Sequence, residues 1–280
     1  MSLINFILNL VALLLWLSWR AGGMTAATRP SVLSLASALK KADPRGPNRW
    51  LYLVALALLL VLRSVFYWQV GAPMRWTPTI QLGVIAPHFR SDFLERMLLF
   101  SALSFVVVLA VFYFSLILLS ISNRSVSDSD PIQKVVRLQL GWLGRWSVSA
   151  QLLLPFLLVV ALWLALHRLF AGLGLISVSV SFMELAQQAA IIGLGAFLAW
   201  KYFIVALLAA HVLNSYVYLG NSPIWNFVNV TAHNLLRPIR WLPLGIGKAD
   251  LRPLVAILLV LVIAHYGGGW LTRLYQHPPL

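Results

Sequence analysis

Two basic side chains interrupt stretches of sequence that are otherwise apolar and long enough to cross a membrane. Lys201 lies within residues 186–213, at least about 15 Å from either end at 1.5 Å per residue, farther than a lysine easily reaches. An ionisable residue inside a membrane is a candidate functional site by default. Two interpretations stay open: either Lys201 is an intramembrane charge with a function, or the true span begins nearer Trp200 and leaves the lysine close to an interface.

Arg63 is the second such charge and lies within residues 50–70. It stands among Phe66, Tyr67 and Trp68, and aromatic residues are typical of a helix end at the membrane surface. The pattern therefore predicts that the guanidinium of Arg63 snorkels to the interface.

Histidines are the third group that could do chemistry. His167 and His265 are both expected toward the outer face, and a facing pair of histidines could ligate a b-type haem. The interpretation that we favour is two interfacial histidines bonded to backbone or water. His211 lies near the inner end of its apolar stretch, and His233 is expected to be solvated.

Arg237 and Arg240 stand three residues apart, so they share one side of a helix if the helix reaches that far. They suit docking to lipid phosphates or to an acidic partner, although basic residues also mark cytoplasmic loops in general. Asp250 is well placed to cap the following span, with Pro253 in its first turn. The residues that we assign to partner or lipid docking are Pro223, Arg237, Pro238, Arg240, Pro243, Gly247, Asp250 and Pro253.

Recognisable catalytic and metal-binding patterns are missing from the sequence. Cysteine is absent, which excludes disulfides, thiolate metal sites and cysteine nucleophiles. There is no Walker A loop, no His-Glu-x-x-His and no Gly-x-Ser-x-Gly. The 7 acidic residues stand mostly in loops and leave little for a di-acid site. We expect no enzymatic activity, no catalytic residue, no metal and no cofactor.

The composition identifies the class of protein that must position these residues. The 280 residues are 61% apolar and 10% charged, whereas a soluble domain is about 45–50% apolar and about 25% charged. Too little polar surface remains to cover a water-soluble globule. We therefore predict an all-α integral membrane protein with about six transmembrane helices. The expected spans are residues 1–19, 50–70, 97–123, 146–167, 186–213 and 251–270.

The first span and the loop charges give an orientation. Positive charge follows the first span at Arg20 instead of preceding it, so we expect a retained helix rather than a signal peptide. The odd-numbered loops carry 14 basic residues and the even-numbered loops carry four. The positive-inside rule then predicts odd loops in the cytoplasm and both termini outside. The net charge of +14 is explained by these loops, and nucleic-acid binding is not expected.

An internal repeat organises the chain. After each odd-numbered span comes a polar stretch, a proline and a short amphipathic segment, and then the next span. The prolines are Pro30, Pro131 and Pro223, spaced by 101 and 92 residues. Proline suits the first turn of a helix, so each segment is expected to be an interfacial helix. The predicted repeats, each a helix, an interfacial helix and a helix, are residues 1–70, 97–170 and 186–280.

The third repeat carries a recognisable series of short motifs. They are Ser222-Pro223, Leu235 to Arg240, Pro243 to Gly247 and Asp250 to Pro253. In these positions the chain resembles the YggT family of bacterial and plastid membrane proteins. The resemblance covers about residues 186–270 and departs from the family pattern at His233-Asn234 and at Trp241.

The resemblance implies a protein of the bacterial cytoplasmic membrane without an established enzymatic activity. Family members have been linked to assembly of membrane complexes or cytochromes, to division and nucleoid distribution, and to osmotic or potassium tolerance. We expect a non-enzymatic accessory, assembly or scaffold subunit of a larger membrane complex, in contact with lipids and other integral membrane subunits, with a homo-oligomer left open. The alternative is a transporter or channel with Lys201 in a polar path.

Overall fold

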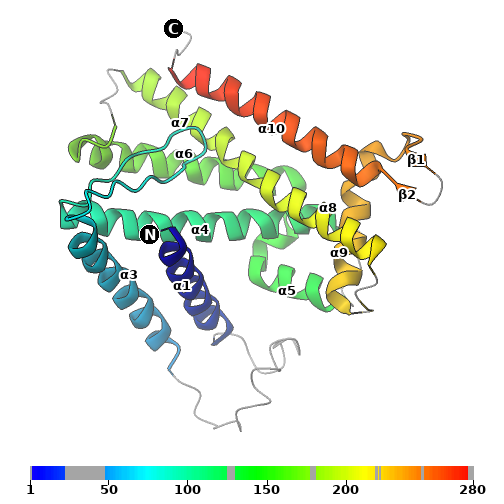
Figure 1. The fold of residues 1–280 in the computed structure, drawn as a ribbon, viewed down its shortest axis with the longest axis horizontal. Helices are drawn as coiled ribbons and strands as arrows, with labels where there is room; N and C mark the ends of the chain where they lie inside the picture. The colour runs from blue at the N-terminus through cyan, green and yellow to red at the C-terminus, as the bar shows by residue number, and fades with distance from the viewer. Residues whose placement is uncertain are drawn as a thin grey trace. The chain divides into compact units, whose positions relative to one another are not determined.

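The computed structural model describes residues 2–22, 48–124, 130–176, 181–217, 220, 222–246 and 249–276. Within these residues six helices are long and apolar enough to cross a membrane, so the chain is an all-α, multi-pass membrane protein, as predicted. The spans are built from α1 (Ser2–Gly22), α3 (Trp50–Gly71), α4 (Leu94–Ser122), α6 (Val148–Gly172), α7 (Phe182–Ala196) with α8 (Trp200–Tyr216), and α10 (Arg252–Gln276) (Figure 1).

Short elements connect the two spans of the second pair and the two spans of the third pair. The α5 and α9 helices each begin with a proline, and each is followed by a short 3-10 helix. The remaining elements are α5 (Pro131–Leu140), η3 (Gly141–Arg145), α9 (Pro223–Leu235), η5 (Arg237–Ile239) and a small antiparallel ribbon of β1 (Gly245–Ile246) and β2 (Ala249–Asp250).

The fifth span is longer than the sequence predicted. It begins at Phe182 because the side chain of Ser181 accepts a hydrogen bond from the backbone N–H of Glu184, which caps the helix. It ends at Tyr216, and the short 3-10 helix η4 (Phe197–Ala199) joins α7 to α8 inside it. In Figure 1 these elements run on as one rod, with α10 packed beside it.

The chain forms two compact units, each with its own core. Unit 1 comprises residues 1–81, 86–110 and 172–176, and unit 2 comprises residues 82–85, 111–171 and 177–280. The 29-residue helix α4 contributes its first part to unit 1 and its last part to unit 2.

In unit 1, α1, α3 and the first part of α4 pack around a small apolar cluster. Ala12, Leu56 and Phe105, one residue from each helix, are its buried centre. In water, burying such side chains stabilises a fold by about 25 cal/mol per Å² of apolar area. In a membrane, close van der Waals packing between the helices takes over this role. The three helices are therefore held by fit and by the polar contacts described below.

In unit 2 the two short helices share one core with the spans. Val136 and Leu140 of α5 and Phe227 and Ala232 of α9 are buried against Leu208 of α8. The amphipathic segments of the second and third repeats therefore turn apolar side chains toward the same cluster.

The order of elements repeats between residues 94–172 and 182–276. Each stretch has a long apolar helix, a proline-led short helix, a 3-10 helix and a second long helix. In the second repeat Asp130 caps α5, its carboxylate accepting from Ile132 and Gln133, with Pro131 at the first helical position. The amphipathic segment of the first repeat, after Pro30, lies outside the described residues.

Candidate functional site

Arg63 lies at the centre of a polar cluster in unit 1. It is 2% exposed in the middle of α3, so the prediction that it snorkels to the membrane surface is wrong. The aromatic residues beside it do mark a helix end. The arginine side chain, however, points toward α1 and α4, which provide hydrogen-bond acceptors.

Three hydrogen bonds hold the guanidinium of Arg63. Its Nε donates to the Ser101 hydroxyl at 3.0 Å, and Nη1 donates to the Asn9 side-chain oxygen at 2.6 Å. Its Nη2 donates to the backbone carbonyl of Ser101. The Ser101 hydroxyl in turn donates to the Leu60 carbonyl at 2.7 Å. All of these acceptors are neutral, so the charge is stabilised by dipoles and not by a carboxylate.

A second layer of polar groups fixes these acceptors. Asn9 donates to the Ser104 hydroxyl at 2.8 Å, which places its oxygen toward the guanidinium. Asn5, one turn earlier on α1, accepts from the Tyr67 hydroxyl at 3.2 Å. The cluster therefore ties α1 to α3 and α4 at two consecutive turns.

Aromatic rings close the cluster on one side. The Tyr67 ring lies 5.8 Å from the Arg63 guanidinium and packs edge-on against Trp76 and Phe100, with ring centroids 5.2 and 5.8 Å away. The rings of Phe89 and Phe100 also pack together in a tilted arrangement, with centroids 5.6 Å apart. These rings exclude lipid and water from the charge, which strengthens its hydrogen bonds and fixes their geometry.

Sequence reasoning missed the partners of Arg63, although a signal was present. Asn5 and Asn9 are one turn apart in an otherwise apolar span, and Ser101 and Ser104 are likewise neighbours on one helical face. Polar residues at helical spacing inside a span usually face another helix. Matching them to the Arg63 span would have predicted the cluster.

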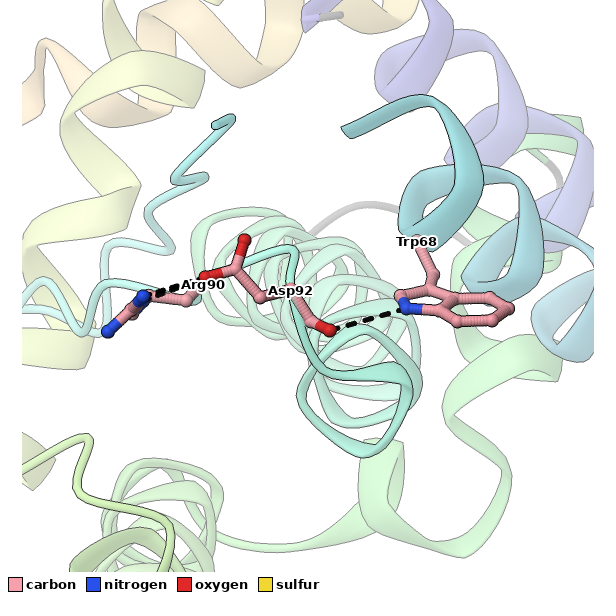
Figure 2. A network of polar contacts seen from close by, with 3 residues as sticks. All are labelled: Trp68, Arg90 and Asp92. Carbon is pink, nitrogen blue, oxygen red and sulfur yellow. Dashed lines mark hydrogen bonds and ion pairs between the residues drawn. The ribbon is translucent and has the colours of Figure 1, made fainter. Parts of the chain in front are cut away.

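The end of α3 beyond this cluster carries an exposed polar contact. The Trp68 indole N–H donates to the Asp92 carbonyl at 3.3 Å, while the Arg90 guanidinium and the Asp92 carboxylate pair at 2.7 Å (Figure 2). An indole at the end of a span, bonded to a polar loop, is the arrangement typical of a membrane interface.

Lys201 is the second residue of α8 and lies two residues past the midpoint of the 35-residue span from Phe182 to Tyr216. The helical span does not begin at Trp200, and the lysine stands well inside it. Its Nζ lies 4.8 Å from the centre of the Tyr202 ring, and the side chain is half-buried. In the part of the chain that the structure describes, no hydrogen bond or ion pair is made by this ammonium.

The residue before it anchors the helix. The Trp200 indole N–H donates to the backbone carbonyl of Phe114 in α4 at 2.9 Å. The ring of Trp200 and the ring of Phe114 also pack against Phe197 in η4. A 3-10 segment inside a long helix marks local strain or a hinge. Here it places Trp200 against α4 and fixes the direction in which Lys201 leaves the helix.

The docking segment predicted between Pro223 and Pro253 stands on a polar cluster in unit 2. The Asn123 side chain donates to the Thr231 hydroxyl at 2.7 Å and accepts from the Asn234 amide at 2.9 Å. Gln133 of α5 donates to the Asn123 carbonyl at 3.3 Å. Asn123 and Thr231 are fully buried, so α9 is fixed to the end of α4 and to α5.

The two arginines of this segment lie together on its surface. Arg237 and Arg240 are the first residue of η5 and the residue after it, and the Arg240 N–H donates to the Arg237 carbonyl. Both side chains are exposed, as are Pro238 and Trp241, the latter to 78%. Ile239 faces the apolar core instead, which holds the turn down. The structure therefore brings the predicted docking residues Arg237, Pro238 and Arg240 to one exposed turn, beside Trp241.

The rest of the segment leads into the last span. Asp250 accepts from the backbone N–H of Arg252 at 2.9 Å, and Pro253 stands in the first turn of α10, as predicted. Pro243 is exposed in the preceding turn, and Pro223 begins α9. Gly247, which the sequence also assigned to this site, lies outside the described residues.

The histidines singled out in the sequence have different surroundings. His167 is buried to 4% exposure and its ring packs on Trp163, while His265 is exposed and packs on Tyr266. His211 instead bonds Asn229 at 2.9 Å, and its ring lies 5.2 Å from that of His233. Among the described residues no group of three or more metal-binding side chains converges.

Comparisons of the chain with protein-family models, with curated proteins and with solved structures found no match.

The arrangement thus offers three polar features with different capacities. The Arg63 cluster is internally satisfied and joins helices. The exposed turn at Arg237 and Arg240 presents two fixed cations that suit an anionic group. Lys201 stands near the middle of an apolar span, and its ammonium lies against the aromatic ring of Tyr202.

Proposed function

We propose that this protein is a non-enzymatic accessory, assembly or scaffold subunit of a larger cytoplasmic-membrane complex. The observation that carries the proposal is the exposed turn with Arg237, Arg240 and Trp241, fixed on a base of buried hydrogen bonds around Asn123. Arginine and tryptophan are enriched at protein interfaces, and a rigid presentation lowers the entropy that binding must overcome.

Two further features support this role. The polar residues of the Arg63 cluster are used to hold helices together, so they do not present a reactive group to a substrate. The α1 and α10 helices bury few residues, and large apolar side chains such as Leu3 and Ile263 are exposed. Such faces suit lipid or the spans of other membrane subunits.

The setting of the protein is part of the proposal. The resemblance of residues 186–270 to the YggT family and the distribution of loop charges support a bacterial inner-membrane location with both termini outside. In that orientation the turn at Arg237 and Arg240 faces the cytoplasm, where it meets anionic headgroups and soluble or membrane-bound partners.

The test is purification from native membranes in a mild detergent, with mass spectrometry of the proteins that migrate with the chain. We expect a stoichiometric set of membrane subunits with the wild-type protein and at least tenfold less of them with Arg237→Ala/Arg240→Ala. The matched control is Lys134→Ala/Arg145→Ala, which removes two exposed charges from the corresponding part of the second repeat. Equal loss in both double variants would indicate general lipid contact and contradict a specific dock.

The second candidate function is a transporter or channel. The observation that favours it is the position of Lys201 in the middle of a span. It predicts that Lys201→Ala abolishes ion flux into proteoliposomes while assembly is retained. The accessory function predicts no flux in the wild-type protein and none that depends on Lys201.

A further inference from the structure

Lys201 stands near the middle of the fifth span. The span has 35 residues from Phe182 to Tyr216, and a bilayer core is crossed by about 20 residues of helix. When the bilayer core is centred on this span, Lys201 lies two residues from the middle of the hydrocarbon layer.

No carboxylate of the described residues pairs with Lys201. The acidic residues of the chain are Asp43, Asp92, Glu95, Asp128, Asp130, Glu184 and Asp250. Those closest to a span interior, Glu95 and Glu184, stand in the first turns of α4 and α7. Glu184 is 17 residues before Lys201 on the same rod, about 26 Å along the axis. The described residues therefore leave Lys201 able to pair with a carboxylate of another molecule.

The two intramembrane cations of this chain are treated differently by the fold. Arg63 is enclosed and makes three hydrogen bonds to neutral groups. Lys201 is half-buried and, within the described ranges, rests against the ring of Tyr202 alone. Charges inside membranes are retained where they pair or line a path. Arg63 is satisfied within the chain, whereas Lys201 is not.

The ammonium points to a part of α8 that no other described element covers. Tyr202 is 67% exposed and Leu213 is 59% exposed, and Ala206 between them is exposed as well. These three residues lie on one side of the helix, since they are four and seven residues apart. The Lys201 ammonium reaches this side through its contact with the Tyr202 ring, 4.8 Å away, and we term the surface the Lys201 face. The small side chain of Ala206 lets a second helix approach closely.

We propose that the Lys201 face binds a transmembrane helix of a partner subunit that carries an aspartate or glutamate at the same depth, and that the carboxylate and Lys201 form an ion pair within the membrane. The inference rests on the proposed accessory function and names the chemistry of its partner. Lipid phosphates cannot serve as that partner, because they lie at the membrane surfaces.

The direct test uses a synthetic transmembrane peptide of Leu and Ala with one central Glu, and the same peptide with Gln instead. Because the chain contains no cysteine, Ser215→Cys near the end of α8 provides a single site for a fluorescent acceptor. Energy transfer from donor-labelled peptide in proteoliposomes reports association. We expect the Glu peptide to associate at least tenfold more strongly than the Gln peptide.

Substitutions of Lys201 separate the ion pair from general helix contact. Lys201→Met should reduce association with the Glu peptide to that of the Gln peptide, while Lys201→Arg should keep it. Leu213→Met, on the same face, is the matched control and should bind as wild type. Lys201→Glu paired with a central-Lys peptide should restore association. Equal binding of the Glu and Gln peptides, or no effect of Lys201→Met, would overturn the inference.

Purification from native membranes then distinguishes the two proposals. Subunits that stay with Lys201→Met but are lost from Arg237→Ala/Arg240→Ala would leave the accessory function standing and overturn the ion pair. A wild-type protein that purifies without companions would overturn the accessory function itself. Loss of companions from both variants, together with discrimination by the Glu peptide, supports both.

Discussion

At the scale of single residues, the fold holds a cation in the hydrocarbon layer without an opposite charge. The Arg63 guanidinium shares its charge among a serine hydroxyl, an asparagine amide and a backbone carbonyl. Hydrogen bonds to charged groups contribute about 1.5–3 kcal/mol each when their loss leaves the charge buried. Asn9 on α1 is the acceptor that a single substitution can remove while Arg63 itself stays unchanged.

Asn9→Leu should therefore destabilise the protein by about 1–3 kcal/mol, because it leaves one nitrogen of a buried guanidinium without its acceptor. Thermal or denaturant unfolding in detergent measures the effect. Ser18→Ala is the control on the same helix, since Ser18 bonds back to the Leu14 carbonyl and should change stability little. In an Arg63→Met background the cost of Asn9→Leu should fall to a few tenths of a kcal/mol, and an unchanged cost would refute the pairing.

A second residue-scale prediction concerns the base of the docking turn. Thr231→Val keeps the shape of the side chain but removes the hydroxyl that accepts from Asn123 at 2.7 Å and donates to Phe227. We expect a loss of about 1–2 kcal/mol in unfolding free energy and weaker retention of partner subunits. Ser115→Ala, which removes a hydroxyl bonded within its own helix, serves as the control.

At the scale of elements, close packing between α6 and α7 depends on one glycine. A Cβ at Gly193 would lie 2.9 Å from the Phe156 ring and 3.0 Å from Val160, so Gly193→Ala should destabilise by about 1–3 kcal/mol. At Gly267 in α10 nothing lies within 4 Å, so Gly267→Ala should stabilise by up to about 1 kcal/mol through helix propensity. Opposite shifts in melting temperature are expected, and shifts of the same sign would argue against the packing.

The elements also mark where sequence reasoning succeeded and where it stopped. Hydropathy located all six spans, and the positions of Asp250 and Pro253 predicted the start of α10, because both signals are local in the chain. The partners of Arg63 lie 54 and 38 residues away, so its burial depended on tertiary packing that an aromatic neighbourhood does not encode. The distance of Lys201 from the start of its span depends on where the helix begins. The cap at Ser181 sets that start, and it can be recognised in the sequence as Ser-x-x-Glu.

At the scale of the whole molecule, the Arg63 cluster has a consequence for how the chain enters the membrane. An arginine at the centre of a span costs about 2.5–3.5 kcal/mol during insertion, and the leucines of α3 offset part of this cost. Asn9 belongs to α1, which precedes α3 in the chain, and Ser101 belongs to α4, which follows it. The first acceptor is therefore already synthesised when α3 leaves the ribosome, and the second arrives one helix later. Insertion of the arginine becomes a stepwise process in which the helix before it receives the charge and the helix after it completes the enclosure.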